Sequence, residues 1–250
     1  MLGGRAGLAS GVDLVPRALD TSPARRVAVF GIAVRVDLSW MFGWALLTWT
    51  LADTVMPVVA PGHGPLAYWL GGGGTALALL VSLALHEAAH CVAARRAGIP
   101  VKRVTLSLFG GATECDRPPA SPGTAFRIAA AGPVASLGTA VGAAVTHVAL
   151  VEAGSDPLAS GVAAIVAVGN LAVALLNLAP GLPLDGGGIL MAGLWRLTGR
   201  QDHALRVAVR AGRLVGGGVI TVAALAAVWG DTPLALWAGL LGFALWSSDK

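Results

Sequence analysis

Residues 76–98 read ALALLVSLALHEAAHCVAARRAG, and this stretch decides how the chain is organised. It is mostly apolar over about 20 residues, the length of a helix that crosses a lipid bilayer. Its centre nevertheless carries His86, Glu87 and His90. Ionisable side chains are costly inside a membrane and usually mark a functional site there. The stretch therefore predicts a membrane helix that carries a chemical site.

The composition of the whole chain agrees with a membrane protein. Of its 250 residues, 56% are hydrophobic and only 12% are charged, and the mean hydropathy is +0.75. Soluble domains carry about 25% charged residues. The net charge of +4 does not indicate a nucleic-acid partner, because the basic residues flank apolar runs and form no patch interleaved with aromatic residues. We therefore expect a lipid bilayer around the protein and no nucleic-acid partner.

The apolar runs predict an all-α polytopic membrane protein with about six transmembrane helices and a small membrane-associated β-strand or hairpin element. The expected spans are residues 38–60, 74–95, 122–150, 158–178, 207–229 and 233–247. They belong to one membrane-embedded domain over 26–250. Residues 1–25 are polar and Gly-rich, and we expect them to be a disordered cytoplasmic segment.

The β element is expected in two places. Alternating apolar residues predict short strands around Gly31 and a further strand at 103–109, which ends at 109–111. Ser121 and Pro122 then have the residue types that cap and begin a helix, which is the third span.

The charges orient the predicted spans. With the N-terminus in the cytoplasm, all 17 Lys and Arg fall in cytoplasmic segments, namely 1–37, 95–127, 180–213 and the C-terminal tail. The positive-inside rule relates such a bias to topology. The sequence thus predicts a multi-pass protein of a prokaryotic-type cell membrane with both termini in the cytoplasm. It leaves the oligomeric state open.

The spacing of the ionisable residues in the opening stretch is that of a metal site. His86 and His90 are four positions apart and share one face of a helix, so they can present two nitrogens to one metal ion. Glu87 lies beside that metal and can take a proton from metal-bound water, as in zinc hydrolases. Cys91 points to another face, so we expect it to be a small packing residue. A chance match is disfavoured because the motif lies within a span.

A catalytic zinc ion normally has three protein ligands and one open position. Asp185 is the best candidate for the third ligand, because it follows the fourth span in NLAPGLPLDGGG, where Pro180 and Pro183 end the helix. Irregular backbone is tolerated at membrane depth where it lines a polar cavity. Alone, Asp185 could equally be a loop acid or a helix N-cap. Together with the two histidines, the ligand interpretation is favoured.

These stretches resemble the site-2 proteases, the membrane-embedded zinc metalloprotease family also known as peptidase family M50. Residues 86–90 are similar to the first motif of that family, and residues 177–186 to its second motif, Asn-x-x-Pro-x-x-Pro-x-Asp-Gly. FGG at 109–111 and AAGPVAS at 130–136 resemble two further family stretches. The resemblance covers about residues 26 to 230.

The resemblance implies an intramembrane zinc endopeptidase, which hydrolyses a peptide bond in or near a transmembrane segment of a signalling protein. It implies that His86, His90 and Asp185 hold one Zn²⁺ ion. Glu87 would activate the water at this ion and then protonate the leaving amine. Asn177 matches the motif asparagine and would contact the substrate or the developing oxyanion.

Two further predictions concern the substrate. Asn170 could orient Asn177, although both amides could instead form only interhelical hydrogen bonds. A substrate helix must unwind before it is cut, and an exposed strand edge offers its backbone new partners. We expect the strand at 104–111 to pair with it, and the contacting residues would be Val104, Thr105, Leu106, Phe109, Gly110 and Gly111.

The chain also departs from the family. Ser136 stands where an asparagine is expected, which weakens any role at that position. Some relatives carry a CBS-type or a PDZ domain, and we expect neither within these 250 residues.

Two alternative functions remain. One is a membrane metal transporter that uses the same His, Glu and Asp cluster, and the other is an inactive binder of transmembrane helices. We find no inverted repeat and no chain of ionisable residues through the other spans, which disfavours a transporter. The presence of Glu87 disfavours an inactive binder.

Overall fold

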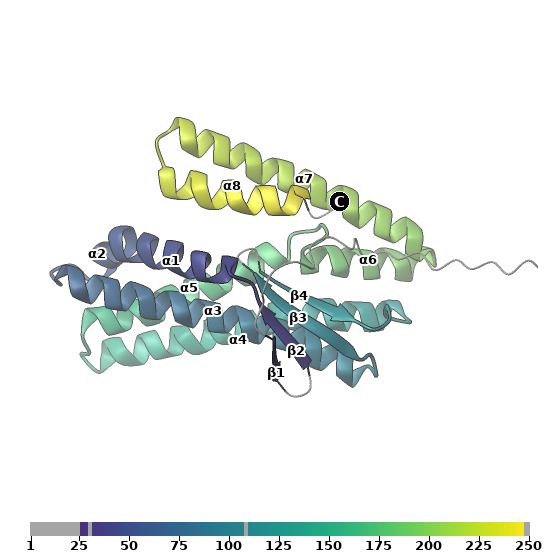
Figure 1. The fold of residues 1–250 in the computed structure, drawn as a ribbon, viewed down its shortest axis with the longest axis horizontal. Helices are drawn as coiled ribbons and strands as arrows, with labels where there is room; N and C mark the ends of the chain where they lie inside the picture. Colours follow the sequence, from purple (N-terminus) through teal and green to yellow (C-terminus); the bar gives the residue numbers. More distant parts are fainter. Residues whose placement is uncertain (1–25, 30–31, 108–109, 248–250) are drawn as a thin grey trace, which may run out of the picture.

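The computed structural model describes residues 26–29, 32–107 and 110–247, so Phe109 and the segment predicted to be disordered, 1–25, lie outside the described residues. The described part is mostly helical, with one small sheet (Figure 1). The helices are α1 (Ser39–Thr50), the π-helical turn η1 (Leu51–Val55), α2 (Met56–Val59), α3 (Pro65–Arg96), α4 (Pro122–Glu152), α5 (Pro157–Asn177), α6 (Asp185–Thr198), α7 (Gln201–Val228) and α8 (Thr232–Ser247).

The helices confirm a polytopic membrane fold. Within the described residues, five helical segments are long and apolar enough to cross a bilayer, namely Ser39–Val59, Pro65–Arg96, Pro122–Glu152, Pro157–Asn177 and Gln201–Val228. The sixth expected span lies in α8, which has 16 residues and is shorter than the usual length of about 20. Large apolar side chains such as Leu77, Val141 and Val145 are each more than half exposed, as lipid-facing side chains are.

Helix α3 is longer than the sequence predicted. It begins at Pro65 instead of residue 74, and its early turns include the glycine run 71–74. Glycine is a poor helix former, which is why the run read as a boundary. The run is explained by packing, because a Cβ at Gly72 would lie 2.9 Å from the amide nitrogen of Ala52. The missing side chain lets η1 approach the backbone of α3 closely.

Two other spans begin with a proline at the first helical position. Pro122 is the first residue of α4, and the Ser121 side chain accepts a hydrogen bond from the Thr124 amide at 3.2 Å, which confirms the predicted cap. Pro157 likewise begins α5 after Asp156, whose carboxylate accepts from an amide in the first turn. These caps satisfy backbone donors that a helix start leaves free.

The sheet contains four strands in the order β1-β2-β3-β4, with bounds Arg26–Val29, Ile32–Val36, Val101–Ser107 and Gly110–Cys115. β1 and β2 are antiparallel, as are β3 and β4, whereas β2 and β3 are parallel. A buried apolar cluster joins the sheet to the C-terminal part of α3, and it consists of Cys91, Ala94, Ile99, Val101, Val104 and Leu106. The sheet therefore lies beside the end of α3 that carries the predicted site (Figure 1).

The strand prediction needs two corrections. Gly110 and Gly111 do not end β3 but begin β4, which pairs back along β3. β3 is hydrogen-bonded to β2 on one side and to β4 on the other, so Val104, Thr105 and Leu106 offer no free backbone edge to a substrate. Val104 and Leu106 are also buried in the apolar cluster. Of the described strands, β4 is the edge on this side of the sheet.

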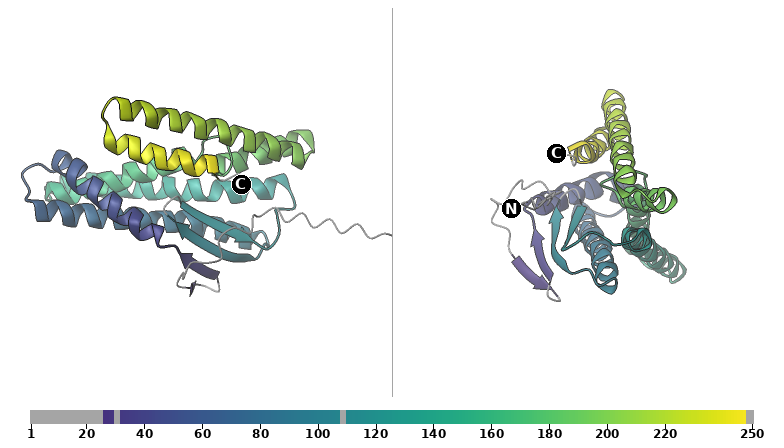
Figure 2. Two further views of the ribbon diagram at one scale, coloured as in Figure 1. Left: turned by 45° about the horizontal axis from the view of Figure 1, so that its top comes forward. Right: turned by 90° about the vertical axis from the view of Figure 1, so that its right-hand side faces the viewer.

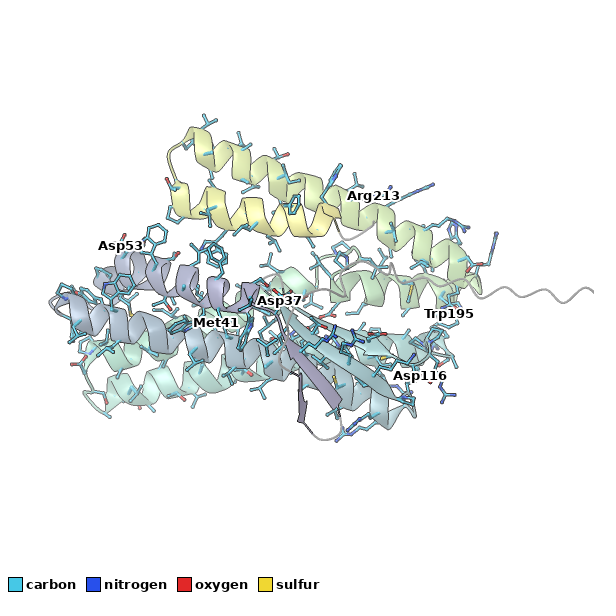
Figure 3. The ribbon with its side chains drawn as sticks, in the orientation of Figure 1. Asp37, Met41, Asp53, Asp116, Trp195 and Arg213 are labelled. Atoms are coloured by element: carbon cyan, nitrogen blue, oxygen red, sulfur yellow. The ribbon has the colours of Figure 1, made fainter. Side chains whose placement is uncertain are left out.

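Helices α7 and α8 pack against each other, and α7 is joined to the rest of the bundle mainly through α6. Figure 2 shows this pair on one side of the bundle and the sheet on another. The bundle has two distinct ends, because Asp53 lies at one and Asp116 and Trp195 lie at the other (Figure 3). Helix α6 itself was not expected from the sequence, because its first turn is glycine-rich and reads as a break.

Candidate zinc site and catalytic residues

Three side chains from two helices converge at one point. His86 and His90 come from α3, and Asp185 is the first residue of α6. The Nε2 atom of His86 lies 3.0 Å from Oδ2 of Asp185, and Nε2 of His90 lies 3.2 Å from Oδ1. The three ligand atoms lie within 4.8 Å of one another, and both histidines are buried. The structure thus brings together the three predicted zinc ligands.

The other ring nitrogen of each histidine has a partner on α4. Nδ1 of His86 lies 2.9 Å from Oγ of Ser136, and Nδ1 of His90 lies 2.7 Å from the carbonyl oxygen of Ile128. A carbonyl oxygen only accepts, so Nδ1 of His90 carries a proton and the neutral ring has a lone pair at Nε2. Such partners orient the histidines of metal sites.

The contact between His90 and Asp185 bears on whether these residues fit a metal ion. The lone pair of His90 Nε2 faces a carboxylate oxygen of Asp185, and both atoms are acceptors. Two acceptors at this distance require a proton or a metal ion between them. Two imidazole nitrogens and one carboxylate form a common ligand set of catalytic zinc. The donor set therefore fits Zn²⁺.

Gly132 of α4 leaves the space that such an ion needs. A Cβ built at this position would overlap the Nε2 atoms of both His86 and His90. A side chain at this position would therefore occupy the region beside both Nε2 atoms. Glycine is required here by the close approach of α4 to the two rings.

Asp185 reaches the histidines because the start of α6 packs very close to other backbone segments. A Cβ at Gly186 would overlap the backbone of Leu178, and one at Gly187 would overlap the backbone of Gly181. The amide of Leu182 donates to the carbonyl of Ala208 in α7, which ties the preceding loop down. Asp185 follows the N-cap Leu184, so it is neither a loop acid nor a helix cap.

Glu87 lies in a cavity of about 390 Å³ that His90 and Asp185 also line. Oγ1 of Thr113 in β4 donates a hydrogen bond to Oε2 of Glu87 at 3.1 Å. A Cβ at Gly111 in the same strand would overlap the Glu87 side chain. The carboxylate therefore lines the same cavity as His90 and Asp185 and lies directly against β4.

The two asparagines have other described contacts. Asn170 is 1% exposed and donates to Oγ of Ser82 at 3.1 Å and to the carbonyl of Val166 at 2.9 Å. It therefore makes the interhelical bond that the sequence offered as an alternative. Asn177 donates to the carbonyl of Val173, one turn earlier in α5. Neither asparagine is among the described residues that line the cavity, so their roles toward the substrate stay predictions.

Sequence reasoning missed four contributors to the site. Ser136 was given little weight because it departs from the family pattern, yet it is 1% exposed and contacts His86. Ile128, Gly132 and Ser136 recur every four residues, so one face of α4 approaches both histidines. Thr113 lies two positions after Gly111 in a strand and therefore on the same face. Both signals are present in the sequence, but only the packing identifies which faces meet.

Comparisons with known proteins identify the family of this chain. Residues 74–164 match the sequence profile of peptidase family M50. Rip3 of Mycobacterium tuberculosis, a candidate zinc metalloprotease by its description, is 39% identical over 231 residues, which are 92% of this chain and 58% of Rip3. The protein sll0528 of Synechocystis, described in the same way, is 34% identical over 87% of this chain and 56% of its own length. The chain thus spans less than two thirds of these curated relatives.

The fold also matches a solved structure. The site-2 protease from Methanocaldococcus jannaschii superposes with a TM-score of 0.62 and 19% identity, over 91% of this chain and 95% of that one. The sequence profile matches residues 74–164, and the curated relatives match 87% to 92% of the chain at 34% to 39% identity. The chain therefore belongs to peptidase family M50, the site-2 protease family.

Proposed function

We propose that this chain is an intramembrane zinc endopeptidase that hydrolyses a peptide bond in or near a transmembrane segment of a protein substrate. The observation that carries the proposal is the convergence of His86, His90 and Asp185 at one point. Glu87 lines the same cavity as His90 and Asp185. These residues lie on or against helices that are apolar and long enough to cross a bilayer. Membership of family M50 supports a hydrolytic role.

Each residue of the site has a part in the proposed reaction. A zinc ion held by the two histidines and Asp185 would supply a Lewis acid toward water and the scissile carbonyl. Glu87 takes a proton from the attacking water and delivers it to the leaving amine. Ser136 and the Ile128 carbonyl hold the two imidazoles in orientation.

The substrate is a membrane protein whose helix unwinds at the site. Its freed backbone groups need hydrogen-bond partners, and an edge strand supplies them. β4 fits this role better than β3, because β3 is paired on both sides. Gly111 of β4 lies against Glu87, so a segment paired with this strand would lie close to the base. All Lys and Arg residues fall in segments that the span order places on one side of the membrane. By the positive-inside rule, this bias supports cytoplasmic termini and release of the product to the cytoplasm.

The test is cleavage of a reconstituted single-span protein by the wild type and by Glu87→Gln, with zinc per chain determined on both. We expect product from the wild type alone at equal zinc content. Glu152→Gln is the matched control, because Glu152 is an exposed glutamate at the C-terminal end of α4, and this variant should cut as the wild type does.

The alternatives give different results. A metal transporter would cut nothing and would move zinc into sealed vesicles. An inactive binder would cut nothing even as the wild type and would hold the substrate equally well with Glu or Gln at position 87. Either result would contradict the proposed protease.

A further inference from the structure

We infer that Thr113 is the positioning residue of the general base, and that it couples this base to the strand beside the substrate. Its hydroxyl holds one oxygen of the Glu87 carboxylate. The inference rests on the proposed function, in which Glu87 transfers the proton. It adds a residue that lies outside both motifs, on a different element of the fold.

The hydrogen bonds at Thr113 have a defined direction. An ionised carboxylate only accepts, so the single hydroxyl proton of Thr113 goes to Oε2 of Glu87 at 3.1 Å. The Sγ atom of Cys91 lies 3.6 Å from the same hydroxyl oxygen, which is then free to accept the thiol proton. The result is a chain from Cys91 through Thr113 to Glu87, in which each bond strengthens the next.

This chain limits the orientation of a flexible side chain. Glutamate has three rotatable side-chain bonds and would otherwise lose entropy when it is fixed. Gly111 allows the Glu87 side chain to lie directly against β4, where a Cβ would overlap it. Thr113 then fixes Oε2, which leaves Oε1 as the oxygen available for proton transfer. Proton transfer requires that this oxygen lie within hydrogen-bond reach of the water.

The position of Thr113 on β4 connects base and substrate. Thr113 pairs with Val104 of β3, so its hydroxyl is placed by the register of this hairpin. β4 is the strand edge to which we assign the substrate, and a paired strand would restrain β4 further. Substrate pairing and base orientation therefore act through one strand, and a disturbance of β4 is transmitted to Glu87.

The kinetic test compares Thr113→Val, which keeps the side-chain shape without the hydroxyl, with Thr113→Ser, which keeps the hydroxyl. General-base catalysis supplies about 100-fold or more, so we expect Thr113→Val to lower kcat on the order of tenfold. KM and zinc per chain should stay unchanged. Thr113→Ser should recover kcat to within about threefold of the wild type. Thr146→Val is the matched control, because its exposed hydroxyl contacts only its own helix.

An infrared difference spectrum tests the hydrogen bond without turnover. The carboxylate band of Glu87 is identified by its loss in Glu87→Gln. We expect this band to shift in Thr113→Val but not in Thr113→Ser or Thr146→Val. An unshifted band, an unchanged kcat, or a loss confined to KM would overturn the inference. A wild type that cuts nothing would overturn the proposed function, and the infrared result would then decide alone whether Thr113 holds Glu87.

Discussion

The Nε2 atom of His86 and Oδ2 of Asp185 lie 3.0 Å apart, although 99 positions separate the two residues in the chain. This contact joins the C-terminal half of α3 to the first residue of α6. Helix α4 packs against both helices and supplies Gly132 and Ser136 to the same point. A metal ion at this point would therefore link α3 to α6, while α4 contacts the two histidine ligands, so metal binding and stability are coupled.

Removal of zinc is expected to destabilise the protein. At a free zinc concentration 100 times the Kd, a ligand that binds only the folded state contributes about 2.7 kcal/mol. A chelator should therefore lower the Tm of the wild type in detergent, and zinc should restore it. Asp185→Asn should show a much smaller shift, whereas Asp53→Asn at the opposite end of the bundle should behave as the wild type does (Figure 3). Equal shifts in all three proteins would argue against Asp185 as a ligand.

Replacement of Ser136 by alanine is expected to weaken zinc binding. Nδ1 of His86 would lose its partner at 2.9 Å, and loss of such an outer partner typically costs about 10- to 100-fold in metal affinity. Competition with a chromogenic chelator measures the Kd directly. Ser160→Ala is the control, because the Ser160 hydroxyl contacts only Pro157 at the start of α5. A Kd unchanged by Ser136→Ala would show that the hydroxyl does not support the ring.

A single methyl group at position 132 should abolish the metal site. Gly132→Ala places a Cβ where it overlaps Nε2 of both His86 and His90, whereas Gly138→Ala on the same helix meets nothing within 4 Å. Both changes gain about 1 kcal/mol of helix propensity, so propensity cannot explain a difference between them. We expect less than stoichiometric zinc for Gly132→Ala and full zinc for Gly138→Ala. Full zinc in both variants would contradict the assigned position of the ion.

The loops at the end of the bundle opposite the sheet contain a pH-dependent contact. Nε2 of His63 lies 3.0 Å from the Asp156 carboxylate, and its Nδ1 lies 3.0 Å from the Ala60 carbonyl. The Ala60 carbonyl and Asp156 raise the pKa of His63 above 6.5. The Leu158 amide and His63 lower the pKa of Asp156 below 3.8. The ion pair is therefore formed between the lowered pKa of Asp156 and the raised pKa of His63.

The sign of the pH effect follows from these directions. The contribution of His63 is fully present below about pH 6.5 and is lost as the pH rises through its raised pKa. Asp156→Asn keeps a residue able to cap α5 but removes the charge. We expect the difference in Tm between the wild type and this variant to be larger at pH 5.5 than at pH 9. A difference that does not change with pH would show that the pair contributes nothing.

The sequence predicted those parts of the site whose arrangement depends on local spacing along a helix. His86, Glu87 and His90 lie within five residues of one helix, so the helical repeat alone places both imidazoles on one face. Hydropathy predicted the apolar spans, because a bilayer requires long apolar helices whatever their neighbours. It failed at the start of α3, where Gly72 is explained only by the approach of η1.

The amino-acid sequence by itself determined a polytopic membrane protein with a His-Glu-x-x-His site and a candidate third ligand, because hydropathy, charge bias and helical periodicity are local properties. Tertiary structure decided what lies against that site. Only packing shows that β3 is enclosed and β4 is the edge, that Ser136 supports His86, and that Thr113 holds Glu87. These relationships join residues far apart in the chain, and their distances depend on how helices and strands pack, which no local pattern encodes.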